Sequence, residues 1–194
     1  MRHEWILTVC MVLAMGAVIA PLMLLMGLKH GTIATLRHKL VQDPVYREIR
    51  PAKTREYPSQ WFQEFAARPE VGFLTPNILA ASSIISVINP STGRTTIYDL
   101  TPTAPGDPLI LENGGRIPEG DQCVVTAAAA DELGVAAGDT LKVRATRSHR
   151  ATRQFGAAEL EVAAVLHPRA GGLPRIYAPL PFVLDVESYR KEWR

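Results

Sequence analysis

An uncharged apolar stretch near the N-terminus constrains this chain more than any other feature of its sequence. Residues 5–28 contain no Asp, Glu, Lys or Arg. As a helix at ~1.5 Å per residue, this stretch is about 36 Å long, enough to cross a hydrocarbon layer of ~30 Å. A lone segment in lipid must be helical, because a helix pairs its backbone polar groups internally. We therefore predict a transmembrane anchor over residues 1–28.

A cleaved signal peptide is the alternative explanation of this stretch. The apolar region of a signal peptide spans only about 7–15 residues and ends in a small-residue cleavage site. Residues 18–20 (VIA) resemble such a site, but Pro21 follows directly and obstructs the peptidase. The sequence therefore favours a retained anchor, which Pro21 kinks locally.

The segment after the span is basic, whereas the rest of the chain is not. Residues 29–55 carry seven Lys or Arg and two acidic residues, and residues 56–194 carry 13 basic and 16 acidic ones. The positive-inside rule, applied to this flank alone, places it in the cytoplasm. Later helices also orient a multi-span protein, and large domains translocate largely regardless of charge. The flank therefore argues against an extracytoplasmic main domain without excluding one.

The composition indicates a globular domain and gives no sign of a disulfide-rich or nucleic-acid-binding protein. The 194 residues include 47% apolar residues, 15 Pro, 14 Gly and two Cys. This length and composition are typical of one globular domain with a core of ordinary size. Two cysteines cannot build a disulfide scaffold, and a formal charge of +2 gives no reason to expect nucleic-acid binding.

Strand signals, interrupted by short helices, dominate the chain after the basic flank. We predict strands at 71–75, 78–88, 94–100, 122–126, 140–146, 159–166 and 175–178. A hairpin connection is expected at 89–93 and a proline-rich loop at 101–108. The pattern predicts an α+β fold, with a juxtamembrane helix and linker at 29–56 and the main domain at 57–194.

Helix signals accompany these strands. We expect a helix over 31–42 that continues the membrane span, and one over 127–133 that Gly134 ends. Ser59 is the expected N-cap of a short helix, whose Trp61, Phe62 and Phe65 are expected to lie in the core. Asp185 is expected to cap a last helix that is cut short at Arg194.

No pattern typical of a catalytic, metal or nucleotide site occurs in the sequence. Cys10 lies in the apolar span, and Cys123 lies in a predicted buried strand, where a free Cys behaves as a small hydrophobe. G-x-S-x-G, P-loop and G-x-G-x-x-G motifs are missing. The histidines lack metal-ligand spacing; they are His3, His30, His38, His149 and His167. We assign no catalytic, cofactor-binding or metal-binding residue and predict that the chain is not an enzyme.

Five basic residues, with no acidic one between them, lie at 142–153 and lead into a predicted connection at 147–156. A solvated loop is the simpler interpretation of this run. The functional alternative is contact with an acidic partner or with anionic lipid headgroups, because clustered cations attract such surfaces. The residues proposed for this contact are Arg147, Arg150 and Arg153.

A series of short motifs carries a family resemblance. They are, in order, 27–31 (GLKHG), 43–44 (DP), 47–51 (REIRP), 61–62 (WF), 123–126 (CVVT), 130–135 (ADELGV), 138–141 (GDTL), 177–181 (YAPLP) and 186–190 (VESYR). Together with the first membrane helix, these motifs resemble the N-terminal part of a permease of the MacB/FtsX-like ABC transporter family.

The resemblance implies a bacterial inner-membrane protein whose main domain is extracytoplasmic and of the MacB periplasmic core type. In such permeases a cytoplasmic ABC-type ATPase drives movement, which the extracytoplasmic domain transmits to a substrate or partner. ATP is therefore expected only on the partner subunit, and the full permease is expected to form a homodimer. Three further membrane helices normally follow, so the chain is expected to be a fragment or a reduced single-span relative.

A different class of function is also open. The chain is then a single-span binding or scaffolding module in the bilayer, without an ATPase partner. Its contact surface would be the basic tip formed by Arg147, Arg150 and Arg153.

Overall fold

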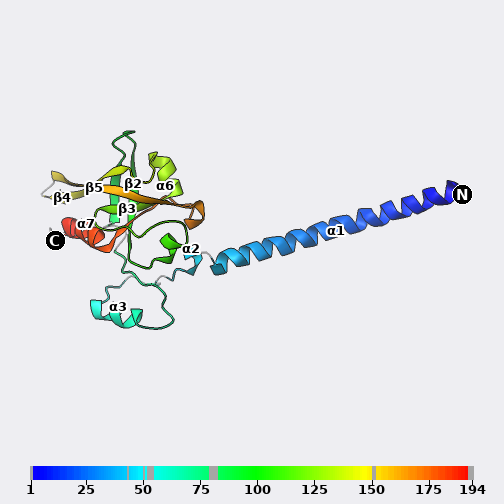
Figure 1. Cartoon of the computed structure of the whole chain (residues 1–194), viewed down its shortest axis with the longest axis horizontal. Helices are drawn as coiled ribbons and strands as arrows, with labels where there is room; N and C mark the ends of the chain where they lie inside the picture. The colour runs from blue at the N-terminus through cyan, green and yellow to red at the C-terminus, as the bar shows by residue number, and fades with distance from the viewer. Residues whose placement is uncertain are drawn as a thin grey trace. The chain divides into compact units, whose positions relative to one another are not determined.

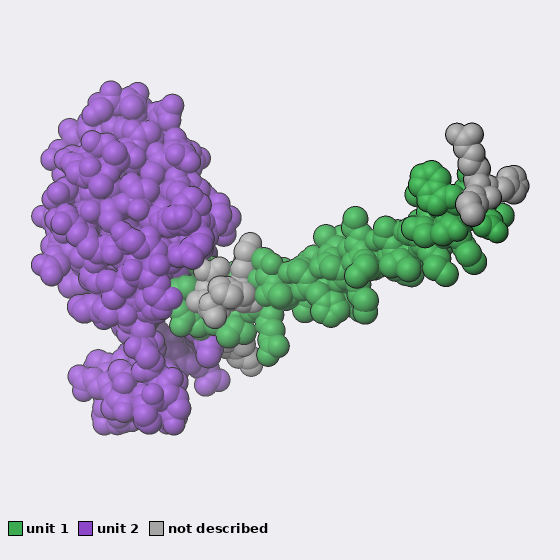
Figure 2. All heavy atoms as spheres, turned by 45° about the vertical axis from the view of Figure 1, so that its right-hand side comes forward, with its two compact units in different colours: residues 1–47 green, residues 48–194 purple. Residues whose placement is uncertain are grey.

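The computed structural model describes residues 2–42, 44–49, 51, 55–78, 83–149 and 152–191. They form two compact units, Met1–Arg47 and Glu48–Arg194, which Figure 2 shows in different colours. The first unit is helical, and the second contains all the described strands.

The first unit is built on one long helix, α1, which runs from Arg2 to Gln42 (Figure 1). Pro21 lies inside α1, and the expected helix at 31–42 continues the apolar stretch without a break. The segment Glu4–Arg37 is long and apolar enough to cross a membrane, and its most apolar part is not buried by protein. By length and composition alone, such a helix fits a membrane anchor and also a signal sequence. The short helix α2, Pro44–Arg47, follows.

The second unit is a closed barrel of six strands in the order β1-β2-β6-β3-β5-β4. The pairs β2–β6 and β3–β5 are parallel, and the other neighbours are antiparallel. The last strand in the sequence therefore lies between the second and the third. The strands are β1 (Ile84–Ile88), β2 (Thr95–Thr103), β3 (Gln122–Thr126), β4 (Thr140–His149), β5 (Thr152–Leu166) and β6 (Ile176–Pro179).

Short helices accompany the barrel strands (Figure 1). α7 packs against β2, β4 and β6, and α6 packs against β3 and β5. The helices of this unit are α3 (Ser59–Ala66), α5 (Pro108–Leu111), α6 (Ala127–Leu133) and α7 (Leu180–Lys191), with a 3-10 turn at Pro168–Ala170. The structure thus confirms an α+β architecture behind a long apolar N-terminal helix.

Alternate residues of the strands point inward and fill the barrel, as the period of two in a strand requires. The main core cluster combines buried strand residues with Leu133 of α6 and Val183 of α7, both of which are fully buried. A second cluster gathers around Ile110, Val124 and Leu166. Fully burying one such side chain stabilises the fold by about 1.5–3 kcal/mol.

Several local predictions are confirmed. The connection at 89–93 joins β1 and β2 as a hairpin, in which the Gly93 amide donates to the Asn89 carbonyl over 2.8 Å. Residues 122–126 form a buried strand, and α6 begins and ends where its sequence indicates. Gly134 ends α6 in the left-handed region at φ +67°, where a side chain is strained.

Four strand predictions need correction. Residues 71–75 are not a strand, and β1 begins only at Ile84, while residues 79–82 lie outside the described part. β2 continues to Thr103, into the expected loop at 101–108, because its last residues pair in parallel with β6. β5 begins at Thr152 rather than at residue 159, because its first residues pair with β4 in a long hairpin.

Two helix caps were also wrong. α7 begins at Leu180, directly after β6, so Asp185 lies within the helix and does not cap it. Ser59 is the first residue of α3, and the residue before it, Pro58, makes no side-chain capping bond. The cap of α3 differs by one residue, whereas α7 begins five residues before Asp185.

Candidate functional site

The basic residues proposed as contacts belong to the β4–β5 hairpin. Arg147 lies in β4, in register with Gln154 of β5, so the expected connection at 147–156 is largely strand. Arg153 also lies in β5, but its side chain, and Arg150 as a whole, fall outside the described residues. The structure therefore places Arg147 on a strand. Contact of Arg147, Arg150 and Arg153 with an acidic partner or with lipid stays a prediction.

Arg147 makes close contacts within its own domain. Its Nε donates to Gln154 Oε1 over 2.8 Å, and its guanidinium carbon lies 4.3 Å from the ring centroid of Tyr189 in α7. A Cβ added at Gly156 would lie only 3.0 Å from the same ring. The Tyr189 ring therefore joins the hairpin to α7, and Gly156 leaves it room.

The contact between Gly156 and Tyr189 is not predicted from the sequence. A glycine inside a strand often marks a close approach by another group. That signal was hidden because Gly156 was assigned to a connection between strands.

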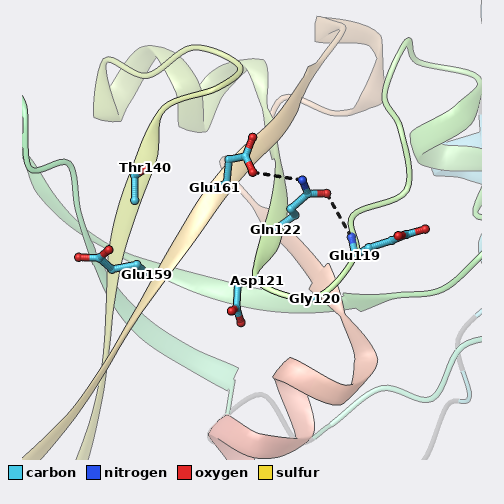
Figure 3. A pocket seen from close by; sticks show the side chains of 7 residues that line it. All are labelled: Glu119, Gly120, Asp121, Gln122, Thr140, Glu159 and Glu161. Carbon is cyan, nitrogen blue, oxygen red and sulfur yellow. Dashed lines mark hydrogen bonds between the residues drawn. The ribbon is translucent and has the colours of Figure 1, made fainter.

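An open acidic pocket is formed where β3, β4 and β5 meet the segment before β3 (Figure 3). The Gln122 side chain bridges it, since its Nε2 donates to Glu161 Oε2 over 3.2 Å and its Oε1 accepts from the Glu119 amide over 3.4 Å. Glu159 forms an ion pair with Lys142, with 3.5 Å between the charged atoms. The lining residues are Glu119, Gly120, Asp121, Gln122, Thr140, Glu159 and Glu161.

The pocket does not have the features of a catalytic centre. All four of its carboxylates are exposed, whereas a carboxylate that serves as an acid or base is usually buried or placed beside a strong charge. Within the described residues, no group of three or more His, Cys, Asp or Glu side chains is arranged to hold a metal ion. The pocket therefore contributes surface charge.

Cys123 is fully buried in β3, as predicted, and belongs to the main core cluster. Burial, with a smaller effect from Glu161, raises the pKa of its thiol to about 12. The reactive form of a cysteine is the thiolate. Cys123 therefore stays protonated at neutral pH and acts as a core residue.

Four aromatic side chains gather on and just before α3, and we call them the aromatic cluster: Tyr57, Trp61, Phe62 and Phe65. Trp61 stacks between Tyr57 and Phe65, with ring centroids 4.4 and 4.8 Å away. Phe62 meets Trp61 edge-on at 5.2 Å. Arg68 lies over the Phe65 ring, with its guanidinium carbon 5.2 Å from the centroid.

The prediction that these aromatic residues lie in the domain core is wrong. None of the eight residues of α3 is buried, and within the described chain the aromatic cluster belongs to neither core cluster. The rings contact one another. The four aromatic side chains are half-buried, largely against one another, and lie outside both core clusters.

No profile of a known protein family matches this sequence, and no curated protein matches it. The functional inference therefore depends on the residues, the fold and the geometry of this chain.

Proposed function

We propose that this chain is the membrane-anchored N-terminal part of an ABC transporter permease of the MacB/FtsX-like kind. Its barrel domain, outside the cytoplasm of a bacterial cell, passes movement driven by a partner ATPase to a substrate or partner protein. The observation that carries this proposal is the continuity of α1 from its apolar part into its polar part.

The length of α1 makes it suitable for transmitting movement. A helix of 41 residues is about 62 Å long at ~1.5 Å per residue, twice the ~30 Å of the hydrocarbon layer. Residues 29–42 continue the same helix beyond the apolar stretch. A tilt or shift of the span is therefore carried out of the bilayer without a flexible joint.

The barrel domain supports a role in binding and transmission. Its strands close on themselves around two buried clusters, so it can move as one body. Its buried thiol is held protonated, and the carboxylates of its acidic pocket are exposed to water. We assign ATP hydrolysis to the partner subunit, as the family resemblance implies.

The position of the barrel relative to the membrane is tested with a single labelling site. Gln154→Cys places a thiol on the hairpin in a chain whose exposed Cys10 is replaced by Ala, while the buried Cys123 is kept. A membrane-impermeant maleimide is expected to label this cysteine in spheroplasts with an intact inner membrane. Labelling only after that membrane is broken contradicts the extracytoplasmic assignment.

Coupling is tested by interrupting the polar part of α1. In nanodiscs, the chain is combined with an ABC-type ATPase encoded beside it, and association and ATP hydrolysis are measured. Thr32→Gly with Ile33→Pro breaks the helix and is expected to abolish the effect on hydrolysis, whereas Thr32→Ala with Ile33→Ala preserves it. If the unaltered chain neither binds the ATPase nor changes hydrolysis, the single-span binding module replaces this proposal.

A further inference from the structure

We propose that the aromatic cluster of α3 docks onto the lipid headgroup region of the membrane that α1 spans. This inference rests on the proposed anchoring by α1. It assigns a ligand, the bilayer surface, to an apolar face that the barrel does not cover.

The residue types of α3 fit a bilayer interface. Tyr57 lies just before α3, and Trp61 and Phe65 follow in the helix at intervals of four residues, so that the three rings stack into one stripe. The polar residues Gln60 and Glu64 are joined by a hydrogen bond of 2.9 Å beside this stripe. Aromatic residues with an apolar body and a polar edge concentrate at the headgroup level of membranes, where short amphipathic helices lie in the plane of the interface.

The linker that precedes α3 is basic, whereas residues 56–70 carry three acidic residues and one basic one, so the attraction to anionic lipid comes from the linker. Residues 44–55, which lead into the aromatic segment, carry four basic residues and one acidic residue. Arg68, on the other side of α3, covers Phe65 with its guanidinium group. Basic segments close to a membrane helix are attracted to anionic headgroups, and this attraction places the aromatic stripe at the surface.

The chain between α1 and α3 is long enough for this contact. Residues 43 and 48–58 can span about 40 Å when extended, at ~3.3 Å per residue, and the helix α2 between them adds about 6 Å at ~1.5 Å per residue. Residues 29–42 of α1 extend only about 21 Å beyond the apolar stretch, at ~1.5 Å per residue. The linker can therefore return α3 to the bilayer in which α1 is anchored.

The three tryptophans of the chain, Trp5, Trp61 and Trp193, provide the test. W5F/W193F retains Trp61 as a reporter of α3, and W61F/W193F retains Trp5 as a reporter of the span. Both proteins are placed in nanodiscs of phosphatidylcholine and phosphatidylglycerol, with or without lipids brominated near the headgroup. We expect brominated lipid to reduce Trp61 emission at least twofold and to quench Trp5 as well.

A pair of matched variants shows whether the aromatic face makes the contact. Phe62→Ser with Phe65→Ser, in the protein that retains Trp61, is expected to remove most of the bromine quenching. Gln60→Ser with Gln63→Ser changes the same number of residues on the polar side and is expected to leave the quenching unchanged. Equal quenching in both variants overturns the proposal.

The two reporters separate failure of the docking from failure of the anchor. If Trp5 is quenched and Trp61 is not, docking is overturned while the anchor stands. If Trp61 is instead shielded from acrylamide without bromine quenching, a second copy or a protein partner covers the face, and lipid docking is also overturned. If Trp5 is not quenched, the anchor itself is wrong, and both proposals fall with it.

Discussion

The barrel and the segment that carries α3 use apolar residues in opposite ways. Leu160 of β5 is fully buried between strands, whereas Trp61, larger and equally apolar in its ring, remains partly exposed among other aromatic residues. In the barrel, each inward side chain is enclosed by neighbouring strands that are themselves paired. Around α3, no described strand encloses the side chains in this way. An apolar side chain is therefore not placed in a core by its hydrophobicity alone.

The same difference applies to the backbone. Strands of the barrel are hydrogen-bonded on both sides, because the ring is closed. α3 has only eight residues, and isolated helices shorter than about 12–15 residues are marginal in water. The barrel is therefore stable through its own contacts, whereas α3 alone has little stability.

The largest expected effect comes from the barrel core. Leu160→Ala leaves a cavity among fully buried neighbours and is expected to lower the free energy of unfolding by about 2–5 kcal/mol. Phe155→Ala, in the same strand but 62% exposed, is the matched control and should change it by less than about 0.5 kcal/mol. Denaturant titration measures both. Similar values for the two variants would mean that the barrel lacks a tightly packed core.

The next largest effect concerns the contact between the hairpin and α7. Gly156→Val forces a side chain against the Tyr189 ring and is expected to cost about 1–3 kcal/mol in the free energy of unfolding. In a Tyr189→Ala background the same change should cost nothing, because the obstructing ring is gone. A double-mutant cycle gives the coupling energy. Additive effects would show that the ring does not pack on Gly156.

A smaller effect is expected where α6 is fixed to the barrel. The Tyr98 hydroxyl in β2 donates to Glu132 Oε2 of α6 over 2.8 Å, and Tyr98→Phe should cost about 0.5–1.5 kcal/mol at neutral pH. Burial, and then Glu132, raise the pKa of Tyr98 above its usual value of ~10. The buried neutral phenol therefore contributes its full share of the free energy of unfolding below pH ~10. This contribution is lost as the pH rises through the raised pKa.

The measurement for Tyr98 is the difference in unfolding free energy between wild type and Tyr98→Phe from neutral to alkaline pH. We expect this difference to shrink above pH ~10. A difference that stays constant would contradict burial of the hydroxyl against Glu132.

The smallest effect on stability is expected in the aromatic cluster. Phe65→Ala removes a ring that lies outside both core clusters, so the free energy of unfolding of the barrel should change by less than about 0.5 kcal/mol. Hydrogen exchange should also show faster exchange for the amides of α3 than for those of β5. A loss as large as that of Leu160→Ala would place α3 within the cooperative unit of the barrel.

The sequence was most informative where one local signal determines the structure. The apolar run predicts a helix in α1, and a glycine that can adopt a positive φ ends α6 at Gly134. The short hairpin at 89–93 is also local, since its turn residues alone direct the chain back. Each of these elements is fixed by residues that are close together in the chain.

Elements that depend on distant partners were predicted poorly. β2 continues to Thr103 only because β6, more than seventy residues later, pairs with it in parallel. The first half of β5 is polar and resembles a loop, but its pairing with β4 makes it a strand. Hydrophobicity alone predicts that Trp61 is buried. Its partial exposure arises because α3 does not pack into either core cluster. The contacts of Tyr189 in α7 with Arg147 of β4 and Gly156 of β5 likewise join three elements. No spacing in the sequence indicates these contacts.

The position of β6 determines when the domain can fold during synthesis. This strand, Ile176–Pro179, fills the gap between β2 and β3, yet it is the last of the six to leave the ribosome. Until then, β2 and β3 each keep an unpaired edge, and the long-range pairing that closes the ring cannot begin. α1 emerges long before that point and can enter a bilayer first. The barrel, which starts at Ile84 in β1, therefore stays open until Pro179 of β6 has been made.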